Sequence, residues 1–385
     1  MAKAHGFPTV VMIGGGQLSR MTQQAAIALG VELRVLSQSP TDSAAQVVGE
    51  IFIGEHDDAA AIEKIVNGAD VVTFDHEHVP LEIIRDLESR GVVVRPGSKA
   101  LAHAQDKVLM RQKLESLEIK QPKWKVLNSV SDGVEFANVV SYPFIIKVSR
   151  GGYDGRGVWV CKDETELADL LSQPLGSDVQ WLAEEFIPFE RELSAQVARS
   201  PHPQMIAYPV VETQQKEGMC SVVIAPAPNL DPERAVEAQR VAMQIADALD
   251  VTGMLAVELF DTGSEILVNE LAMRPHNSGH WSIDGAITSQ FENHLRAVLD
   301  LPLGSPKAKS EWTVMVNVIG GDFSDMFHAF KHCMARDPHV KIHMYGKEVR
   351  KGRKIGHVNV SSENLEDALR RAQHAADYLI GNIEE

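Results

Sequence analysis

The strongest chemical signal in the sequence is a glycine-rich stretch at its centre, Phe144 to Val160. A predicted strand ends near Lys147, glycines follow at 151, 152, 155 and 157, and a second strand then begins. This is not a Walker loop, because no helix and no G-K-[ST] follow. Backbone N–H groups of such a hairpin can cover phosphates while Lys147 supplies a positive charge. A plain hairpin turn is the alternative, but so many glycines would be entropically costly there, and we favour a phosphate-binding flap.

Two glutamates, Glu258 and Glu270, could hold a hard cation. Each lies in an apolar strand-like run, where an unpaired carboxylate would be costly. The D-T-G-S sequence at 261–264 predicts a hairpin between the two runs. If the loop centres on Gly263, Glu258 pairs with Val268, and Glu270 is its diagonal neighbour on the same face. The pair predicts a Mg²⁺ site completed by nucleotide phosphates, with solvent-facing glutamates as the alternative.

A polar stretch, RPHNSGH at 274–280, follows the second carboxylate. Beside a metal–phosphate site, Arg274 and His276 could hold an oxyanion and move protons. His276 and His280 are four residues apart, which would suit a metal on a helix. Pro275 and Gly279 instead favour a loop, so we disfavour metal ligation by both histidines.

The glycine turn at 14–16 lies between a predicted strand, Thr9 to Ile13, and a predicted helix, Gln17 to Leu29. Its match to the dinucleotide fingerprint is incomplete, because Ser19 occupies the third glycine position and no acidic residue ends the second strand. An NAD-dependent oxidoreductase is therefore disfavoured. Binding of another phosphate and a purely structural turn remain equally open.

Length, net charge and composition restrict the partners and the cellular location that the sequence allows. A length of 385 residues suggests two or three domains, and the net charge of −16 argues against nucleic acid or an anionic membrane as a partner. The chain has no apolar run near the ~20 residues of a membrane span. Its three scattered cysteines argue against a disulfide framework or a structural zinc site and favour a reducing, cytoplasmic location.

The elements that must position the chemistry fall into three regions. Strand and helix signals alternate over the first hundred residues, including strands at Val71 to Phe74 and Val92 to Val94 around a helix at Leu81 to Ser89. This alternation predicts a parallel α/β sheet. One long helix is expected from Lys99 to Leu117, and strands with glycine-rich turns follow. The stretch DLPLGSPKAK, 300–309, resembles a domain boundary before further strands and a last helix at Glu363 to Ile380.

Five segments together resemble the ATP-grasp superfamily and, within it, the 5-(carboxyamino)imidazole ribonucleotide synthases of purine biosynthesis. They read IGGGQLSRM (13–21), GGYDGRG (151–157), AEEFIPFERELS (183–194), NELAMRPHNSGHWSIDGAITSQFE (269–292) and YGKEVRKGRKIGHVN (345–359). The sequence departs from the usual family pattern at Ser19, at TFDHEHV (73–79), at Gln215 and at Met273. None of these departures removes a charged group proposed for catalysis.

The resemblance implies a multidomain fold of the α/β and α+β classes. It places an N-terminal parallel α/β (Rossmann-like) domain at 1–106, an ATP-grasp domain with its glycine-rich flap at 107–308, and a small C-terminal domain for the substrate phosphate at 309–385. It also implies an ATP- and bicarbonate-dependent ligase. Carboxyphosphate, or CO₂ released from it, would carboxylate 5-aminoimidazole ribonucleotide, with Mg²⁺ as cofactor. A homodimer is expected.

The resemblance also implies roles for individual residues. Arg274, His276 and Lys354 would be catalytic, and Glu258 and Glu270 would hold Mg²⁺. ATP would contact Lys107, Lys147, Gly152, Tyr153, Asp154, Gly155, Arg156, Gly157, Glu184, Glu185, Phe186, Ile187, Glu192, Asn269 and Glu270. The substrate would contact Gln17, Leu18, Tyr153, Asp154, Arg156, Asn277, Ser278, Lys347, Arg353 and Lys354.

The basic segment 347–354 carries five cations in a strongly acidic chain. A solvated turn is the plain interpretation, yet Arg and Lys are the usual partners of a ribose phosphate. We expect Lys347, Arg353 and Lys354 to face the substrate and Lys351 to face solvent. Two other functions stay open at this point: another ATP-grasp ligase, resembling biotin carboxylase or the formate-dependent glycinamide ribonucleotide transformylase, and a non-catalytic nucleotide-binding protein.

Overall fold

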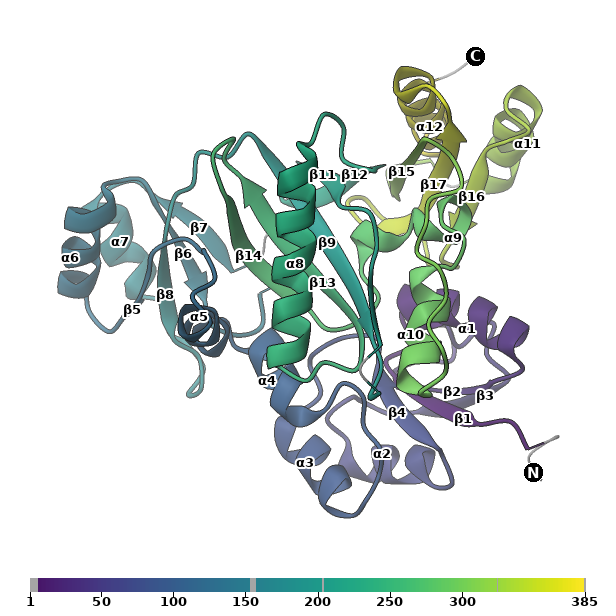
Figure 1. Cartoon of the computed structure of the whole chain (residues 1–385), viewed down its shortest axis with the longest axis horizontal. Helices are drawn as coiled ribbons and strands as arrows, with labels where there is room; N and C mark the ends of the chain where they lie inside the picture. Colours follow the sequence, from purple (N-terminus) through teal and green to yellow (C-terminus); the bar gives the residue numbers. More distant parts are fainter. Residues whose placement is uncertain (1–5, 153–156, 203, 324, 384–385) are drawn as a thin grey trace.

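The computed structural model describes residues 6–152, 157–202, 204–323 and 325–383. Its N-terminal region is a parallel sheet of four strands in the order β3-β2-β1-β4 (Figure 1). The elements are β1 (Thr9–Ile13), α1 (Gln17–Leu29), β2 (Glu32–Ser37), β3 (Glu50–Ile53), α2 (Ala59–Val66), β4 (Val71–Phe74) and α3 (Leu81–Ser89). The expected parallel α/β sheet is confirmed, and β1, α1, β4 and α3 have the predicted bounds.

Two expectations about this region are wrong, and two elements were not predicted. The strand expected at Val92 to Val94 is only a single bridge from Val94 to Val72, while β3 and α2 had been missed. The single helix expected from Lys99 to Leu117 is two helices, α4 (Ser98–Gln105) and α5 (Lys107–Ser116). Asp106 breaks it, because its backbone is extended and its carboxylate accepts hydrogen bonds from the N–H groups of Val108 and Leu109. An aspartate that caps a new helix ends the previous one.

A small antiparallel sheet, β5-β8-β6-β7, follows. Its strands are β5 (Trp124–Leu127), β6 (Phe144–Val148), β7 (Val158–Cys161) and β8 (Trp181–Glu185), with α6 (Val130–Val140) and α7 (Glu164–Leu171). Both helices lie on one side of this sheet, at the left of Figure 1. Strands β6 and β7 pair antiparallel, with Lys147 opposite Val158, so the glycine-rich stretch does connect a hairpin.

The large sheet has the order β14-β13-β9-β11-β12-β15-β17-β16, with β10 on β9. Its strands are β9 (Arg191–Arg199), β10 (Met205–Ala207), β11 (Val211–Lys216), β12 (Met219–Ala225), β13 (Gly253–Asp261), β14 (Ile266–Ala272), β15 (Trp312–Ile319), β16 (Lys341–Met344) and β17 (Lys354–Ser362). Helix α8 (Pro232–Ala248) packs on β9, while α11 (Met326–Arg336) and α12 (Leu365–Leu379) lie together beyond β15 (Figure 1). Because β15 pairs with β12, the sheet continues across the stretch 300–309.

The hairpin register differs from the predicted one. Glu258 pairs directly with Glu270, whereas Leu259 pairs with Val268, so Asn269 is an extra residue in a β-bulge. The expected pairing of Glu258 with Val268 is therefore wrong, because Val268 pairs with the next residue, Leu259. The bulge brings the two carboxylates opposite each other rather than along a diagonal.

Two further observations concern the helices and the cysteines. Among the described residues, no helix has the length and apolar character needed to cross a membrane. Cys161, Cys220 and Cys333 are all buried and free.

Candidate active site

A cavity of about 790 Å³ lies between the two antiparallel sheets and the N-terminal region. Most of the residues predicted to bind ATP, metal or substrate line it, although they come from distant parts of the chain. They are Gln17, Leu18, Lys107, Lys147, Gly152, Glu184, Glu185, Phe186, Ile187, Glu192, Glu258, Asn269, Glu270, Arg274, His276, Asn277 and Lys354. The described residue Gly157 is at the base of the flap and is not among the lining residues, and Tyr153, Asp154, Gly155 and Arg156 lie outside the described residues.

Lysine and glutamate side chains form ion pairs along one side of this cavity. Lys107 Nζ lies 2.7 Å from Glu270 Oε1, and Lys147 Nζ lies 2.7 Å from Glu184 Oε2. Arg111, which is fully buried, holds the other oxygen of Glu184 at 2.7 Å. Burial alone would raise the pKa of Glu184, but Arg111 and Lys147 outweigh it and lower the pKa to about 2. Both ammonium groups line the cavity, where they can meet an anion.

Arg111 also fixes the bulge. Its guanidinium donates hydrogen bonds of 2.8 Å to the carbonyl oxygens of Val268 and Asn269. The planar fork of arginine suits this double contact. Arg111 therefore links the ion pairs to the hairpin register that sets Glu270 opposite Glu258.

The two carboxylates, Glu258 and Glu270, are in different electrostatic environments. Burial, together with the charge of Glu270, raises the pKa of Glu258 to about 7. For Glu270, burial also favours the neutral form, but the charge of Lys107 outweighs it and lowers the pKa. Two crowded carboxylate oxygens facing a polar cavity fit a hard divalent cation, which would relieve their repulsion.

The donor set is small. The described residues hold no cluster of three or more His, Cys, Asp or Glu side chains arranged to bind a metal. Two carboxylates without further side-chain ligands are typical of Mg²⁺ that is also held by nucleotide phosphates. The site thus fits Mg²⁺ better than a transition metal, and His280 is fully buried outside the cavity lining.

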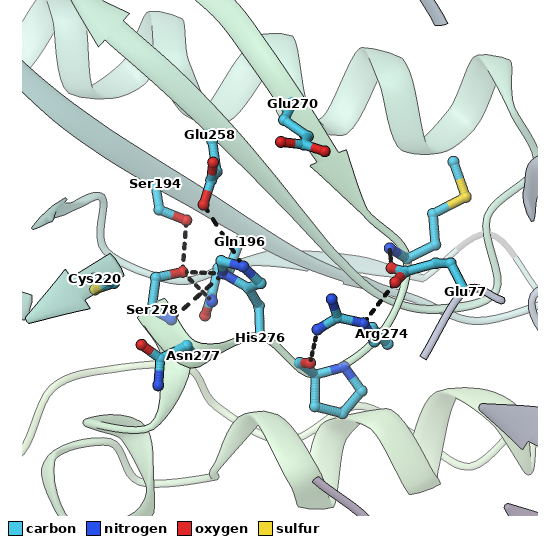
Figure 2. A network of polar contacts seen from close by, with 12 residues as sticks. Glu77, Ser194, Gln196, Cys220, Glu258, Glu270, Arg274, His276, Asn277 and Ser278 are labelled. Atoms are coloured by element: carbon cyan, nitrogen blue, oxygen red, sulfur yellow. Dashed lines mark hydrogen bonds and ion pairs between the residues drawn. The ribbon is translucent and has the colours of Figure 1, made fainter. Parts of the chain in front are cut away.

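Arg274 and His276 approach the cavity from the loop after β14 (Figure 2). Arg274 Nε donates to Glu77 Oε2 at 2.7 Å and Nη1 donates to the Pro275 carbonyl at 3.2 Å. His276 Nε2 lies 3.6 Å from Glu258 Oε1. The loop continues as a 3₁₀ turn, η1 (Asn277–Gly279), in agreement with the prediction that the segment is not an α-helix.

A second cavity of about 700 Å³ lies at the carboxyl ends of β1, β2, β3 and β4. Its lining includes the glycine turn 14–16 and, from the basic segment, Lys347, Arg350 and Arg353. Asp75, His76 and His78 line both cavities and form the wall between them. The position, outside the carboxyl ends of parallel strands, is where ligands bind in open α/β sheets.

The basic segment is divided between the two cavities. Lys347 and Arg353 line the second cavity and Lys354 lines the first, while Lys351 is exposed and lines neither. Lys347 Nζ donates to Gln17 Oε1, so the segment contacts the start of α1. Ser278 lines neither cavity, since its side chain is buried behind His276.

Known proteins match the chain along its whole length. Residues 7–105 match the ribonucleotide synthetase preATP-grasp domain, 112–291 the ATP-grasp domain and 313–371 the phosphoribosylaminoimidazole carboxylase C-terminal domain. The N5-carboxyaminoimidazole ribonucleotide synthase of Mycobacterium tuberculosis is 50% identical over 97% of this chain and 88% of its own length. The chain belongs to the N5-carboxyaminoimidazole ribonucleotide synthase family.

Further relatives agree. The synthase of Corynebacterium ammoniagenes is 44% identical over 98% of this chain and 94% of its own. The crystal structure of the Thermus thermophilus synthetase has a TM-score of 0.87, is 36% identical, and covers 98% of this chain and 99% of that one. That of Aspergillus clavatus, in complex with ADP and 5-aminoimidazole ribonucleotide, has a TM-score of 0.88 at 28% identity, covering 98% and 99%. The predicted family, the three-domain fold and the ligase activity are thereby confirmed.

Several residues of the site had not been predicted from the sequence. Arg111 gave no local signal, because a single arginine in a helical stretch is ordinary. Asp75 and Glu77 lie in TFDHEHV, one of the segments that depart from the usual family pattern. Burial raises the pKa of Asp75 to about 6, and its carboxylate accepts a hydrogen bond from the backbone N–H of Gly16.

Another departure from the family pattern lies at the edge of the first cavity. Gln215 lines the cavity, and its side chain hydrogen-bonds Glu192, whose pKa is nevertheless raised by burial. Gln215 thus contacts a glutamate that was expected to bind ATP.

Proposed function

We propose that this chain catalyses the ATP-dependent conversion of 5-aminoimidazole ribonucleotide to N5-carboxyaminoimidazole ribonucleotide, with bicarbonate as the carbon source. The observation that carries the proposal is one cavity that joins ion-paired lysines, two facing carboxylates and Arg274 with His276. Identity of 50% to a synthase of this name over nearly the whole chain supports it.

ATP occupies the first cavity in this proposal. Lys107 and Lys147 bind its phosphates beneath the glycine-rich flap, and 184–187 with Glu192 bind the nucleoside. Glu258 and Glu270 hold Mg²⁺, with Asn269 beside them. The bound ion supplies charge neutralisation for phosphoryl transfer, which is chiefly a matter of positioning and electrostatics. The carboxylate partners of both lysines support this assignment, because they fix the two ammonium groups before ATP arrives.

The carboxylation proceeds through carboxyphosphate. A bicarbonate oxygen attacks the γ-phosphorus of ATP, the bond to the β–γ bridging oxygen breaks, and ADP leaves. The 5-amino group then attacks the carboxyl carbon, or CO₂ released from it, and inorganic phosphate leaves. Arg274, His276 and Lys354 contact the carboxyphosphate. A cavity between two sheets suits this reaction, since the intermediate hydrolyses when water reaches it.

The second cavity binds the ribose phosphate of the aminoimidazole substrate. Lys347 and Arg353 provide the charge, and Gln17, Leu18 and Asn277 contact the rest of the molecule from the first cavity. Support comes from Asp75, His76 and His78, which line both cavities and so place the basic segment's cavity directly beside the one that holds His276.

One assay tests the proposal. ADP formation is measured with aminoimidazole ribonucleotide, bicarbonate and Mg²⁺ each omitted in turn, and ¹³C-bicarbonate is followed into the product by NMR. We expect substrate-stimulated ADP release and a labelled carbamate. Equal stimulation by formate without a labelled carbamate would instead favour the transformylase-like alternative.

We further propose domain limits at 1–106, 107–308 and 309–385, a homodimer and a cytoplasmic location. The three free cysteines support a reducing compartment. Light scattering of the purified chain tests the dimer, and a monomer at micromolar concentration would reject it.

A further inference from the structure

The imidazole of His276 is held at both of its nitrogens (Figure 2). Nε2 is directed towards Glu258 in the cavity, at 3.6 Å from Oε1. Nδ1 points away from the cavity and lies 2.8 Å from Ser278 Oγ. The protonation pattern at Nδ1 therefore decides which nitrogen carries hydrogen on the cavity side.

Ser278 lies at the centre of a buried hydroxyl cluster. Its Oγ is 2.8 Å from Ser194 Oγ on β9 and accepts a hydrogen bond of 3.0 Å from Gln196 Nε2. The three side chains are at most 2% exposed. Without water as an alternative partner, each buried donor needs an acceptor within this cluster.

Counting donors selects one arrangement. The backbone N–H of Ser278 points at His276 Nδ1 at 3.4 Å, which requires a lone pair there. A hydroxyl has one hydrogen and two acceptor positions. If Gln196 and Ser194 both donate to Ser278 Oγ, its own hydrogen goes to His276 Nδ1, where it shares the nitrogen's lone pair with the more distant backbone N–H of Ser278. If Nδ1 carried the hydrogen instead, the Ser278 N–H would lose its acceptor, and the Ser194 hydroxyl would have none in the cluster.

The backbone of His276 is fixed separately. Gln290, also fully buried, accepts from the His276 N–H at 2.9 Å and donates to its carbonyl at 2.8 Å. A Cβ at Gly279 would lie 2.4 Å from Gln290 Oε1 and 2.5 Å from Gln196 Oε1, so only glycine lets both amides approach the turn. The main chain and the ring are thus anchored by different residues.

We propose that Ser278, supported by Ser194 and Gln196, is a positioning residue that keeps His276 in the Nε2–H tautomer with that N–H directed into the cavity. The inference rests on the proposed function only for its catalytic consequence. It gives Ser278 a different role from the substrate contact expected from the family resemblance. The hydroxyl orients the histidine that would donate to a carboxyphosphate oxygen.

The tautomer is read by ¹⁵N NMR of the histidine side chains in the full-length chain, with His276 assigned through His276→Gln. At pH 8 we expect Nδ1 of the wild type to resonate as an unprotonated nitrogen. In Ser278→Ala the signal should shift towards the average of two tautomers. A protonated Nδ1 in the wild type, or an unchanged signal in the variant, overturns the proposal. This readout does not depend on which reaction the chain catalyses.

Kinetics give the second readout. Ser278→Ala should lower kcat about tenfold, the loss of roughly one hydrogen bond, while KM for ATP changes less than twofold. Ser278→Thr, which keeps the hydroxyl, should restore activity, and Ser194→Ala should act in the same direction more weakly. The matched control is Ser361→Ala, which removes a hydroxyl bonded to Thr313 Oγ1 away from the site. Equal kcat values for Ser278→Ala and Ser361→Ala contradict the proposal.

Discussion

At the scale of single residues, the two facing glutamates have opposite effects on stability. Glu258 has a raised pKa of about 7, so ionising it in the folded protein without a cation is unfavourable. Glu270 has a lowered pKa, because its carboxylate pairs with a lysine that is only 9% exposed. A bound cation would therefore stabilise the ionised form of Glu258, whereas Glu270 is already paired with Lys107.

Glu258→Gln should stabilise the nucleotide- and Mg²⁺-free protein at high pH. Between pH 4.5 and about 7, the folded protein keeps a proton on Glu258 that the unfolded chain loses, so the glutamate lowers stability as pH rises through this window. We expect Tm to rise by roughly 2–4 °C at pH 8, after discounting for a side chain that is 31% exposed, and not to change near pH 4.5. ADP formation should be lost.

Glu270→Gln is the comparison for this measurement. Its folded pKa is lowered, so its ionised form stabilises the protein above pH 4.5 and this contribution is lost as pH falls through the folded pKa. The variant should melt below wild type at pH 8, since Lys107 loses its partner. Thermal melts at both pH values decide the matter, and Tm shifts of the same sign for the two variants would refute the assignment.

At the scale of elements, the bulge in β14 matters more than either strand alone. If Asn269 were paired regularly instead of forming the bulge, the side chains after it would point to the opposite face of the sheet. The Glu270 side chain would then point away from the cavity. Arg111 on α5 holds the two bulge carbonyls and Glu184 on β8 at the same time. One helix thus keeps two sheets in register at the nucleotide site.

Arg111→Leu should destabilise the protein by about 3–5 kcal/mol, because it leaves a buried carboxylate short of a partner. Arg111→Lys keeps the charge but loses the fork, and should recover part of the stability while ADP formation stays low. Chemical denaturation and the ADP assay measure both effects. Arg90→Ala is the control, because it removes an exposed ion pair with Glu63 whose loss should have little effect on stability. If Arg111→Leu is as mild as the control, Arg111 does not hold the bulge.

At the scale of the whole molecule, the C-terminal segment completes a site that begins in the N-terminal sheet. Ser43 Oγ donates to the Tyr345 carbonyl at 2.6 Å, and Gln46 Nε2 donates to the Gly346 carbonyl at 2.7 Å. These contacts join residues about three hundred positions apart. They bring Lys347 and Arg353 to the second cavity, while β17 carries Lys354 to the first.

Arg353→Ala should therefore raise KM for aminoimidazole ribonucleotide about ten- to a hundredfold, the value of a charge-assisted phosphate contact, with little change in KM for ATP. Lys354→Ala should instead lower kcat. Lys351→Ala is the matched control, since this exposed lysine lines neither cavity. Steady-state kinetics with each substrate varied separately test these different roles of Arg353 and Lys354. Equal effects of Arg353→Ala on both KM values would instead support the interpretation of the segment as a solvated turn.

The sequence by itself determined the features that depend on neighbouring residues. Helix α1 runs from Gln17 to Leu29 because an apolar face ends at Gly30, which adopts the left-handed conformation that glycine tolerates. The glycine-rich hairpin, the loop at 274–280 and the family motifs are equally local, and they were sufficient to predict the ligase and half of the residues that line the first cavity.

Only the tertiary structure decided the rest. The hairpin register was missed because Arg111 holds the bulge from 157 residues away, and no local spacing encodes that contact. From the sequence, the basic segment was expected to form one substrate-facing site. In the structure, Lys347 and Arg353 line the second cavity, whereas Lys354 at the start of β17 lines the first. Ser278 looked like a substrate contact until its burial against Ser194 and Gln196 was seen. In each case a long-range hydrogen bond or the alternation of faces determined where the side chain points, and neither is fixed by sequence neighbours.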